Sequence, residues 1–183
     1  MSRVYLTRPL PDSVLARARD LFDEVEVREE TAPLKIGQMR AALALYDGVL
    51  PTLGDMFSAE VFLDTENPRC KVLANFGVGY NHIDVTAARA AGVMVTNTPG
   101  AVTDATADIA MTLILMSARR AGEGERLVRA GKWEGWHPTQ MLGLHVSGKT
   151  VGIIGMGRIR QAIAHRCHSG YGRDVSGTAS GRG

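Results

Sequence analysis

Short apolar runs alternate with stretches of helical spacing along the first half of the chain. The runs that predict strands are residues 3–7, 24–29, 47–53, 70–76 and 93–98. The stretches that predict helices are residues 11–22, 35–46, 58–63 and 85–92. Residues 24–29 alternate apolar and charged side chains, which is typical of a strand at a sheet edge. Alternating strands and helices with short connections predict a parallel sheet covered by helices.

The layout changes after this first α/β domain. A long helix is predicted from about residue 103, followed by a short helix and an irregular arm. The arm carries Trp133 and Trp136, which are typical of packing or interface anchors. A short apolar strand at residues 149–156 then enters a glycine turn and another helix. Residues 169–183 are rich in Gly, Ser and Arg, so we expect a disordered tail. The expected domains are residues 1–99, 100–168 and 169–183.

The overall composition narrows the class of protein. Of the 183 residues, 45% are hydrophobic and 22% are charged, as in ordinary globular chains. A net charge of +2 and 5% aromatic residues disfavour nucleic acid as a partner. Cys70 and Cys167 form no close pair, which indicates reduced cysteines in a cytoplasmic setting. The N-terminus has no signal-peptide core, and the most apolar stretch, residues 109–118, is too short to cross a bilayer, so no membrane partner is expected.

The stretch from Gly155 to Arg160 follows an apolar strand and opens a helix, as the phosphate-binding turn of dinucleotide-binding proteins does. In that turn the first glycine permits the tight bend, the second lets the diphosphate approach the backbone, and the third permits close packing of helix on strand. Gly155 and Gly157 stand at the first two positions, but Arg160 stands at the third. Asp174 has the spacing of a ribose-binding residue, but it does not end an apolar strand. The motif indicates descent from a dinucleotide turn, with an ordinary strand-to-helix turn as the alternative.

A second pair of glycines lies between Asn75 and Asp84, also after an apolar strand. The backbone amides of Val78 and Gly79 are candidates to bind a carboxylate, as amide nests do. Alternatively, Gly77 and Gly79 only satisfy the backbone geometry of a turn. The spacing by itself favours this second interpretation.

His165, Cys167 and His168 are residue types that bind metals and stand close together near the end of the last predicted helix. Only the two histidines share a helix face, and no second cluster of ligands accompanies them. A zinc site needs three or four such ligands brought together, so no metal site is expected.

Three stretches occur in one order along the chain: VLANFGVGYNHIDVTAARAAGVMVTNTPGAVTDATADIAMTLIL, GKWEGW and GLHVSGKTVGIIGMGRI. Together they resemble the D-isomer-specific 2-hydroxyacid dehydrogenases, in particular the glyoxylate/hydroxypyruvate reductase branch. The resemblance implies a flavodoxin-like parallel-sheet substrate domain, followed by the first βα unit of a Rossmann domain. It implies the NAD(P)H-dependent reduction of a 2-keto acid to a D-2-hydroxy acid.

The resemblance also implies roles for individual residues. Leu53 would line the substrate pocket, and the amides of Val78 and Gly79 would bind the substrate carboxylate. The residues implied in cofactor binding are Thr106, Gly155, Gly157, Arg158 and Ile159. The expected ligands are a small 2-keto or 2-hydroxy acid and NAD(P)H, and a homodimer through the tryptophan arm is expected. These implications strengthen the anion-binding interpretation of the second glycine pair.

The chain departs from the family pattern in two places. The family has glycine where Arg160 stands, and it has an apolar strand where this chain has residues 174–183. The catalytic arginine, glutamate and histidine of the family lie downstream of any residue here, so no catalytic residue is assigned. This predicts a chain truncated or frame-shifted after about Cys167 and inactive in the family reaction. The alternative function is a non-catalytic carboxylate-binding or regulatory module.

Overall fold

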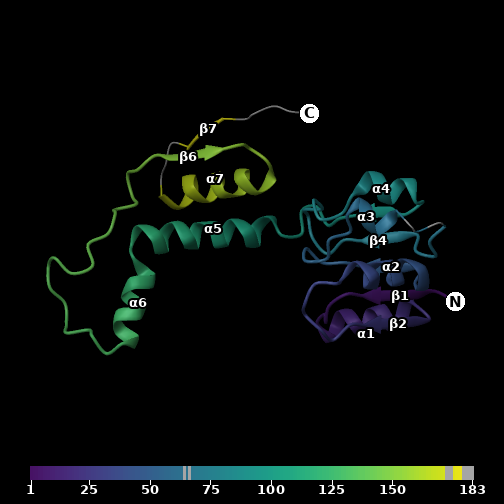
Figure 1. Ribbon diagram of the computed structural model, residues 1–183. Coiled ribbons are helices and arrows are strands. Elements are labelled where there is room, and N and C mark those ends of the chain that lie inside the picture. The colour runs from purple at the N-terminus through teal and green to yellow at the C-terminus, as the bar shows by residue number, and fades with distance from the viewer. Residues whose placement is uncertain (64, 66, 172–174, 179–183) are drawn as a thin grey trace. The chain divides into compact units, whose positions relative to one another are not determined.

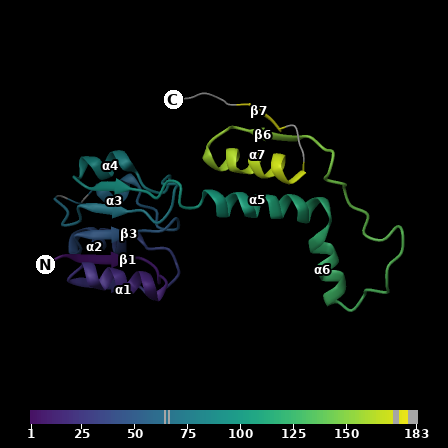
Figure 2. The ribbon, with the colours of Figure 1, turned by 180° about the vertical axis from the view of Figure 1, so that it is seen from behind.

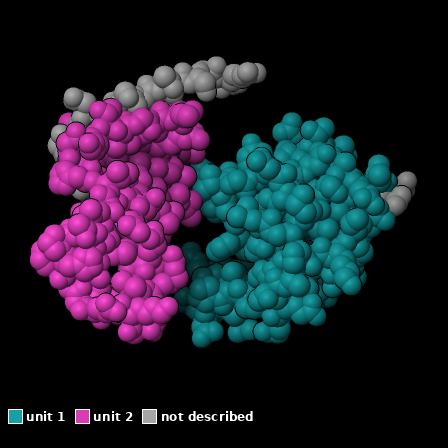
Figure 3. All heavy atoms as spheres, turned by 60° about the vertical axis from the view of Figure 1, so that its left-hand side comes forward, with its two compact units in different colours: residues 1–99 teal, residues 100–183 magenta. Residues whose placement is uncertain are grey.

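The computed structural model describes residues 1–63, 65, 67–171 and 175–178. The chain divides into two compact units, Met1–Pro99 and Gly100–Gly183, which Figure 3 colours separately. The first unit is built on a parallel sheet, and the second contains a long helix and a strand–helix–strand arrangement.

A five-stranded parallel sheet forms the centre of the first unit (Figure 1). Its strands are β1 (Arg3–Leu6), β2 (Glu24–Val27), β3 (Gly48–Leu50), β4 (Val72–Ala74) and β5 (Met94–Thr96). The spatial order is β2-β1-β3-β4-β5, and each neighbouring pair is parallel. This is the strand order of the flavodoxin-like fold, so the predicted fold class is confirmed. β2 lies at an edge of the sheet, as its alternating pattern predicts.

Helices follow the first four strands along the chain. They are α1 (Asp12–Leu21), α2 (Ile36–Leu45), α3 (Ala59–Phe62) and α4 (Val85–Ala90). Side chains of α2, α3 and α4 pack with alternate strand residues into the main core, which includes Leu34, Met39, Leu43, Phe57, Val61 and Leu73. The apolar periodicity of these segments therefore identifies the buried side of the helices.

The opposite face of the sheet is covered differently. Successive side chains of a strand point to opposite faces, so a second set of alternate strand residues faces away from the main core. Within the described part of this unit, α1 packs over that face and leaves an apolar groove of about 230 Å³. Its lining includes Val4, Leu6, Val14, Ala18, Phe22 and Val72. No residue of α1 is fully buried, so this face is packed less completely than the other.

The second unit contains α5 (Thr103–Ala118), α6 (Ala121–Arg129), β6 (Val151–Ile154), α7 (Arg158–Tyr171) and β7 (Val175–Thr178). Figures 1 and 2 show α5 and α7 side by side, with both helices beginning at the same end of the unit. Arg166 of α7 forms ion pairs with Asp104 at 3.0 Å and Asp108 at 2.7 Å. The strand and helix predicted around the glycine turn are therefore present, and the helix is held against α5.

The predicted disordered tail, residues 169–183, lies only partly within the described chain. α7 continues through Tyr171, and Val175–Thr178 form β7, which pairs in parallel with β6. Residues 172–174 and 179–183, which include Asp174, lie outside the described residues. The hydrophobic pattern does not reveal β7, because a ladder of backbone hydrogen bonds forms it and Val-Ser-Gly-Thr has a single apolar side chain. The structure thus contains a β6–α7–β7 unit where the sequence predicts one strand and one helix.

An irregular arm joins α6 to β6. Trp133 and Trp136 on this arm are 49% and 78% exposed, so neither is a buried packing anchor within the described part of the chain. A homodimer through the arm stays a prediction. None of the described helices is both long enough and apolar enough to cross a membrane.

Two leucines on α2 test the assignment of the core. Leu43 has no exposed surface, whereas Leu45 is 50% exposed. We expect Leu43→Ala to lower the free energy of unfolding by about 2–5 kcal/mol, because it leaves a cavity. Leu45→Ala serves as the matched control and should change it by about 0.5 kcal/mol or less. Urea unfolding followed by circular dichroism measures both, and equal losses would contradict the described core.

Candidate functional site

Loops meet at the carboxyl edge of the parallel sheet, because all five strands run in the same direction. The chain order reverses between β1 and β3, and open α/β sheets bind ligands at such a point, beyond the carboxyl ends of the strands. The loop after β3 carries Leu53, and the loop after β4 carries Val78 and Gly79. The residues predicted to contact substrate therefore lie on neighbouring loops at this edge.

The loops after β3 and β4 are held against each other. The N–H of Phe76 donates a hydrogen bond to the carbonyl oxygen of Pro51 at 2.9 Å. Cδ2 of Leu53 lies 3.7 Å from the point where a Cβ on Gly77 would stand. We call residues 75–84, between β4 and α4, the glycine loop. Leu53 is 63% exposed, so its side chain forms an apolar wall beside this loop that is open to solvent.

The side-chain amides of Asn75 and Asn97 donate hydrogen bonds to the carbonyl oxygens of the glycine loop. Nδ2 of Asn75 donates to the carbonyl oxygens of Gly77 at 3.1 Å and Gly79 at 2.9 Å. Nδ2 of Asn97 donates to the carbonyl oxygen of Val78 at 2.8 Å. Asn75 is only 2% exposed, so the loop is fixed from inside the protein.

The N–H groups of the same loop are available. Within the described chain, the N–H groups of Val78 and Gly79 donate no hydrogen bond. Gly77 has a φ of +154°, which favours glycine, whereas Gly79 has no positive φ. A Cβ on Gly79 would meet no atom within 4 Å. Turn geometry therefore accounts for Gly77 but not for Gly79, and the open space beside Gly79 suits the close approach of a ligand to the backbone.

A histidine orients Asn75 from behind the loop. Nε2 of His82 lies 2.9 Å from Oδ1 of Asn75. Because Asn75 uses its NH2 group on the loop carbonyls, its Oδ1 accepts, and Nε2 of His82 carries the proton. Burial lowers the pKa of the His82 imidazole, although the carboxylate of Asp55 acts in the opposite direction. His82 is thus neutral near pH 7 and engaged with Asn75.

A buried carboxylate fixes the loop after β3. The side chain of Asp55 accepts hydrogen bonds from Oγ1 of Thr7 at 2.6 Å and from the N–H of Leu34 at 2.9 Å. It also accepts the N–H of Thr52 at 3.1 Å and pairs with Arg8 at 2.9 Å. Burial works to raise the pKa of this carboxyl, but the hydrogen bonds outweigh burial and hold the pKa below its ordinary value. Asp55 is therefore an ionised anchor for the loop that carries the apolar wall.

The second unit carries the glycine turn between β6 and α7. Gly155 has a φ of +82°, a left-handed conformation that favours glycine. Gly157 has no positive φ, and a Cβ there would meet no atom within 4 Å. Gly155 thus serves the bend, while the backbone at Gly157 is open beside the N-terminus of α7. That arrangement fits the diphosphate part of a dinucleotide.

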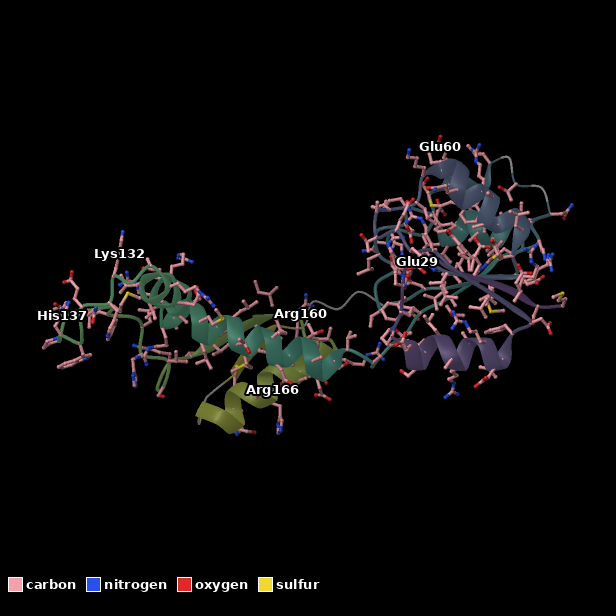
Figure 4. The ribbon with its side chains drawn as sticks, turned by 90° about the horizontal axis from the view of Figure 1, so that it is seen from below. Glu29, Glu60, Lys132, His137, Arg160 and Arg166 are labelled. Carbon is pink, nitrogen blue, oxygen red and sulfur yellow. The ribbon has the colours of Figure 1, made fainter. Side chains whose placement is uncertain are left out.

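Arg160, which replaces the third glycine, folds back over the turn. Its Nη1 lies 2.5 Å from the point where a Cβ on Gly155 would stand, and its side chain is exposed (Figure 4). Arg158 and Arg160 both lie in the first turn of α7, and neither forms an ion pair with a described residue. Cations oppose the helix dipole at this end, so the pair is unfavourable for the helix itself but suits a bound anion.

The remaining predicted cofactor residues belong to the same unit. Thr106 is exposed near the start of α5, and Ile159 is half-buried in the first turn of α7. Because both helices begin at the same end, these residues and the glycine turn share one end of the unit (Figure 2). Their contact with a cofactor stays a prediction.

The cluster near the end of α7 is not arranged as a metal site. Among the residues that the structure describes, no group of three His, Cys, Asp or Glu side chains is placed to hold a metal ion. Cys167 is 1% exposed, and its Sγ lies 3.5 Å from Sδ of Met111. This side chain therefore packs between α7 and α5 as a small apolar group, and its burial raises the pKa of the thiol.

Sequence reasoning missed the residues that hold the loops after β3, β4 and β5 in place. They are Asn75, His82, Asn97 and Asp55. Asn75 and Asn97 each directly follow a strand, which was the available signal that they stand at the carboxyl edge. Their partners depend on tertiary contacts that hydrophobic periodicity does not report.

The strand order and the two glycine motifs define an α/β protein that joins a flavodoxin-like domain to a dinucleotide-type β–α–β unit. More specifically, the chain belongs to the D-isomer specific 2-hydroxyacid dehydrogenase family, whose catalytic domain matches residues 4–180. The resemblance noted in the sequence is thereby confirmed at the level of the family.

Individual relatives agree with this assignment. The chain is 41% identical over 174 residues to a glyoxylate reductase of Korarchaeum cryptofilum, covering 94% of this chain and 51% of that protein. It is 39% identical over 173 residues to a glycerate dehydrogenase of Hyphomicrobium methylovorum, covering 94% and 53%. A crystal structure of a putative D-isomer specific 2-hydroxyacid dehydrogenase from Polaromonas has a TM-score of 0.87 at 38% identity, covering 100% and 56%. The chain spans about half the length of the curated relatives it matches.

The buried carboxylate gives a prediction for stability. Because its pKa is lower in the folded chain, ionised Asp55 stabilises the fold above about pH 4, the ordinary value for aspartate, and this contribution is lost as the pH falls through the folded pKa. We expect Asp55→Asn to lower the free energy of unfolding by about 3 kcal/mol at pH 7, because it leaves Arg8 without its charged partner. The difference from the wild type should shrink toward pH 3. Urea unfolding at both pH values measures this.

Exposed Asp20→Asn is the matched control for the same chemical change and should leave stability nearly unaltered at both pH values. A pH-independent loss in Asp55→Asn would contradict an ionised Asp55 in the fold.

Proposed function

We propose that this chain is the substrate-binding and cofactor diphosphate-binding part of a D-2-hydroxyacid dehydrogenase of the glyoxylate/hydroxypyruvate reductase type. The family reaction reduces a 2-keto acid to a D-2-hydroxy acid with NAD(P)H. The observation that carries the proposal is the pair of N–H groups at Val78 and Gly79, which lack acceptors among the described residues and belong to the loop that Leu53 approaches at Gly77.

The loops after β3 and β4 together supply the two recognition elements that a small 2-keto acid needs. Two neighbouring N–H groups suit the two oxygens of a carboxylate, as backbone nests do. Leu53, which approaches Gly77 in the loop that carries these amides, offers exposed apolar surface to the carbon skeleton. Since Gly79 carries no side chain, a ligand can approach the backbone closely.

The glycine turn of the second unit supplies the cofactor diphosphate site. Its residues would be Gly155, Gly157, Arg158 and Ile159, with Thr106 from α5. The left-handed Gly155, the open Gly157 and the start of α7 support this assignment. The cofactor, when bound, supplies the hydride that reduces the substrate carbonyl. The described residues would bind and orient the substrate and the cofactor, and we expect this polypeptide to bind them without turnover.

Glyoxylate binding tests the substrate half of the proposal. We expect glyoxylate to shift the amide NMR signals of Val78 and Gly79 in the full chain. Gly79→Ala should weaken binding by about tenfold, because a methyl group enters the space used by the ligand. Its backbone is not strained, so its thermal midpoint should stay near that of the wild type. Gly170→Ala, at another open glycine with no positive φ, is the control and should bind normally.

NADH and NADPH, titrated separately by calorimetry, test the cofactor half. We expect binding of one or both, and a loss of about tenfold in Gly157→Ala because its methyl group stands where the diphosphate approaches. Gly152→Ala, in β6, is the control. Glyoxylate binding without cofactor binding would favour the carboxylate-binding module instead, and oxidation of NADPH by glyoxylate at an ordinary enzymatic rate would contradict binding without turnover.

A further inference from the structure

The direction of the N–H groups in the glycine loop follows from the hydrogen bonds that its carbonyl oxygens accept. In a trans peptide unit, the carbonyl oxygen of one residue and the N–H of the next point to opposite sides. Asn75 binds the carbonyl oxygen of Gly77, and Asn97 binds that of Val78. The N–H groups of Val78 and Gly79 are therefore turned away from the two asparagines that hold the loop.

We propose that Asn75 and Asn97 are positioning residues for the anion site, and that His82 sets the orientation of Asn75. The proposal rests on the proposed function, since it assigns the residues that present the substrate-binding amides. The two asparagines act through the loop backbone: they hold its carbonyl oxygens on the protein side and so direct its N–H groups outward.

The loop needs a donor of fixed orientation at Asn75. An asparagine amide can present either its NH2 group or its oxygen in the same space. If the amide of Asn75 were reversed, Oδ1 would face the carbonyl oxygens of Gly77 and Gly79, which also only accept. The proton on Nε2 of His82 pairs with Oδ1 and selects the orientation that holds the loop. Asn75 and His82 are 2% and 7% exposed, so water has little access to replace this bond.

A purely structural role is the competing explanation. In that case the network would contribute to folding, and the affinity for an anion would follow the fraction of folded protein alone. The two roles separate when affinity is measured in variants that remain folded, and when a variant that restores only the N–H donor is included.

The first experiment compares two substitutions of His82 in the full chain. Amide NMR titration with sodium glyoxylate gives the dissociation constant, and thermal unfolding gives the midpoint. His82→Leu removes the donor and should weaken glyoxylate binding by about tenfold, the scale of one lost hydrogen bond. His82→Gln retains an N–H donor near the same position and should bind within about twofold of the wild type.

The second experiment reverses a donor directly. Asn97→Asp replaces the NH2 group by a carboxylate oxygen that faces the carbonyl oxygen of Val78. We expect the affinity for glyoxylate to fall by at least about tenfold. The amide signals of Val78 and Gly79 should already be shifted before glyoxylate is added. Asn81→Asp is the matched control: it adds the same charge at an exposed position of the loop after β4, which also carries Val78 and Gly79. Its smaller loss measures the effect of charge alone. If His82→Leu does not fold, the comparison of Asn97→Asp with Asn81→Asp decides between the positioning role and the purely structural role.

The outcomes separate the two proposals. If glyoxylate leaves the Val78 and Gly79 signals of the wild type unmoved, both the anion site and its positioning residues are overturned. If the wild type binds glyoxylate and both His82→Leu and Asn97→Asp bind it with the wild-type affinity, the positioning role alone is overturned. Equal losses in His82→Leu and His82→Gln, or in Asn97→Asp and Asn81→Asp, also overturn it. Rescue by His82→Gln together with a specific loss in Asn97→Asp supports it.

Discussion

The ionised carboxylate of Asp55 ties together segments that are far apart in the sequence. Thr7 follows β1, Leu34 precedes α2, and Thr52 lies in the loop after β3, yet all three donate to this one side chain. A buried carboxylate is tolerated only when its oxygens are satisfied, so these segments must meet at the carboxyl edge of the sheet. The position of the apolar wall formed by Leu53 depends on this requirement, and so does its distance from the glycine loop after β4.

In both glycine motifs, which lie in different units, the two glycines serve different purposes. In each, the first glycine has a positive φ, at Gly77 and Gly155, and the second does not. The second glycine, Gly79 or Gly157, faces open space in which a Cβ would meet no atom of the protein. Folding therefore explains the first glycine of each motif and leaves the second unexplained. Access of a ligand to the backbone is a physical reason for a glycine where neither conformation nor packing requires one.

Hydrophobic periodicity predicted the strands and helices of the first unit because their burial repeats along the chain, as it does at Met39 and Leu43 on α2. The alternation of strands and helices predicted a parallel sheet covered by helices, and the family resemblance implied its flavodoxin-like arrangement. The interactions that hold the site were not predictable in this way. Thr7 and Asp55 are 48 residues apart, and the partners of Asn75 are set by the path of a loop. β7 was missed for a related reason, since its pairing with β6 uses the backbone and leaves little trace in side-chain pattern.

The two sites also differ in how their charge is arranged. In the loop after β4, neutral amides hold the backbone, and the charged Asp55 that anchors the neighbouring loop is compensated inside the protein, so both loops hold their form without an anion. At the glycine turn, Arg158 and Arg160 crowd the positive end of α7 with no ion pair among the described residues. That local conflict costs helix stability. Sequences keep such conflicts mainly where function requires them, and a doubly charged diphosphate would relieve this one. The substitution at the third glycine position is therefore compatible with an anion at the turn, because it adds a cation while the backbone at Gly157 stays open.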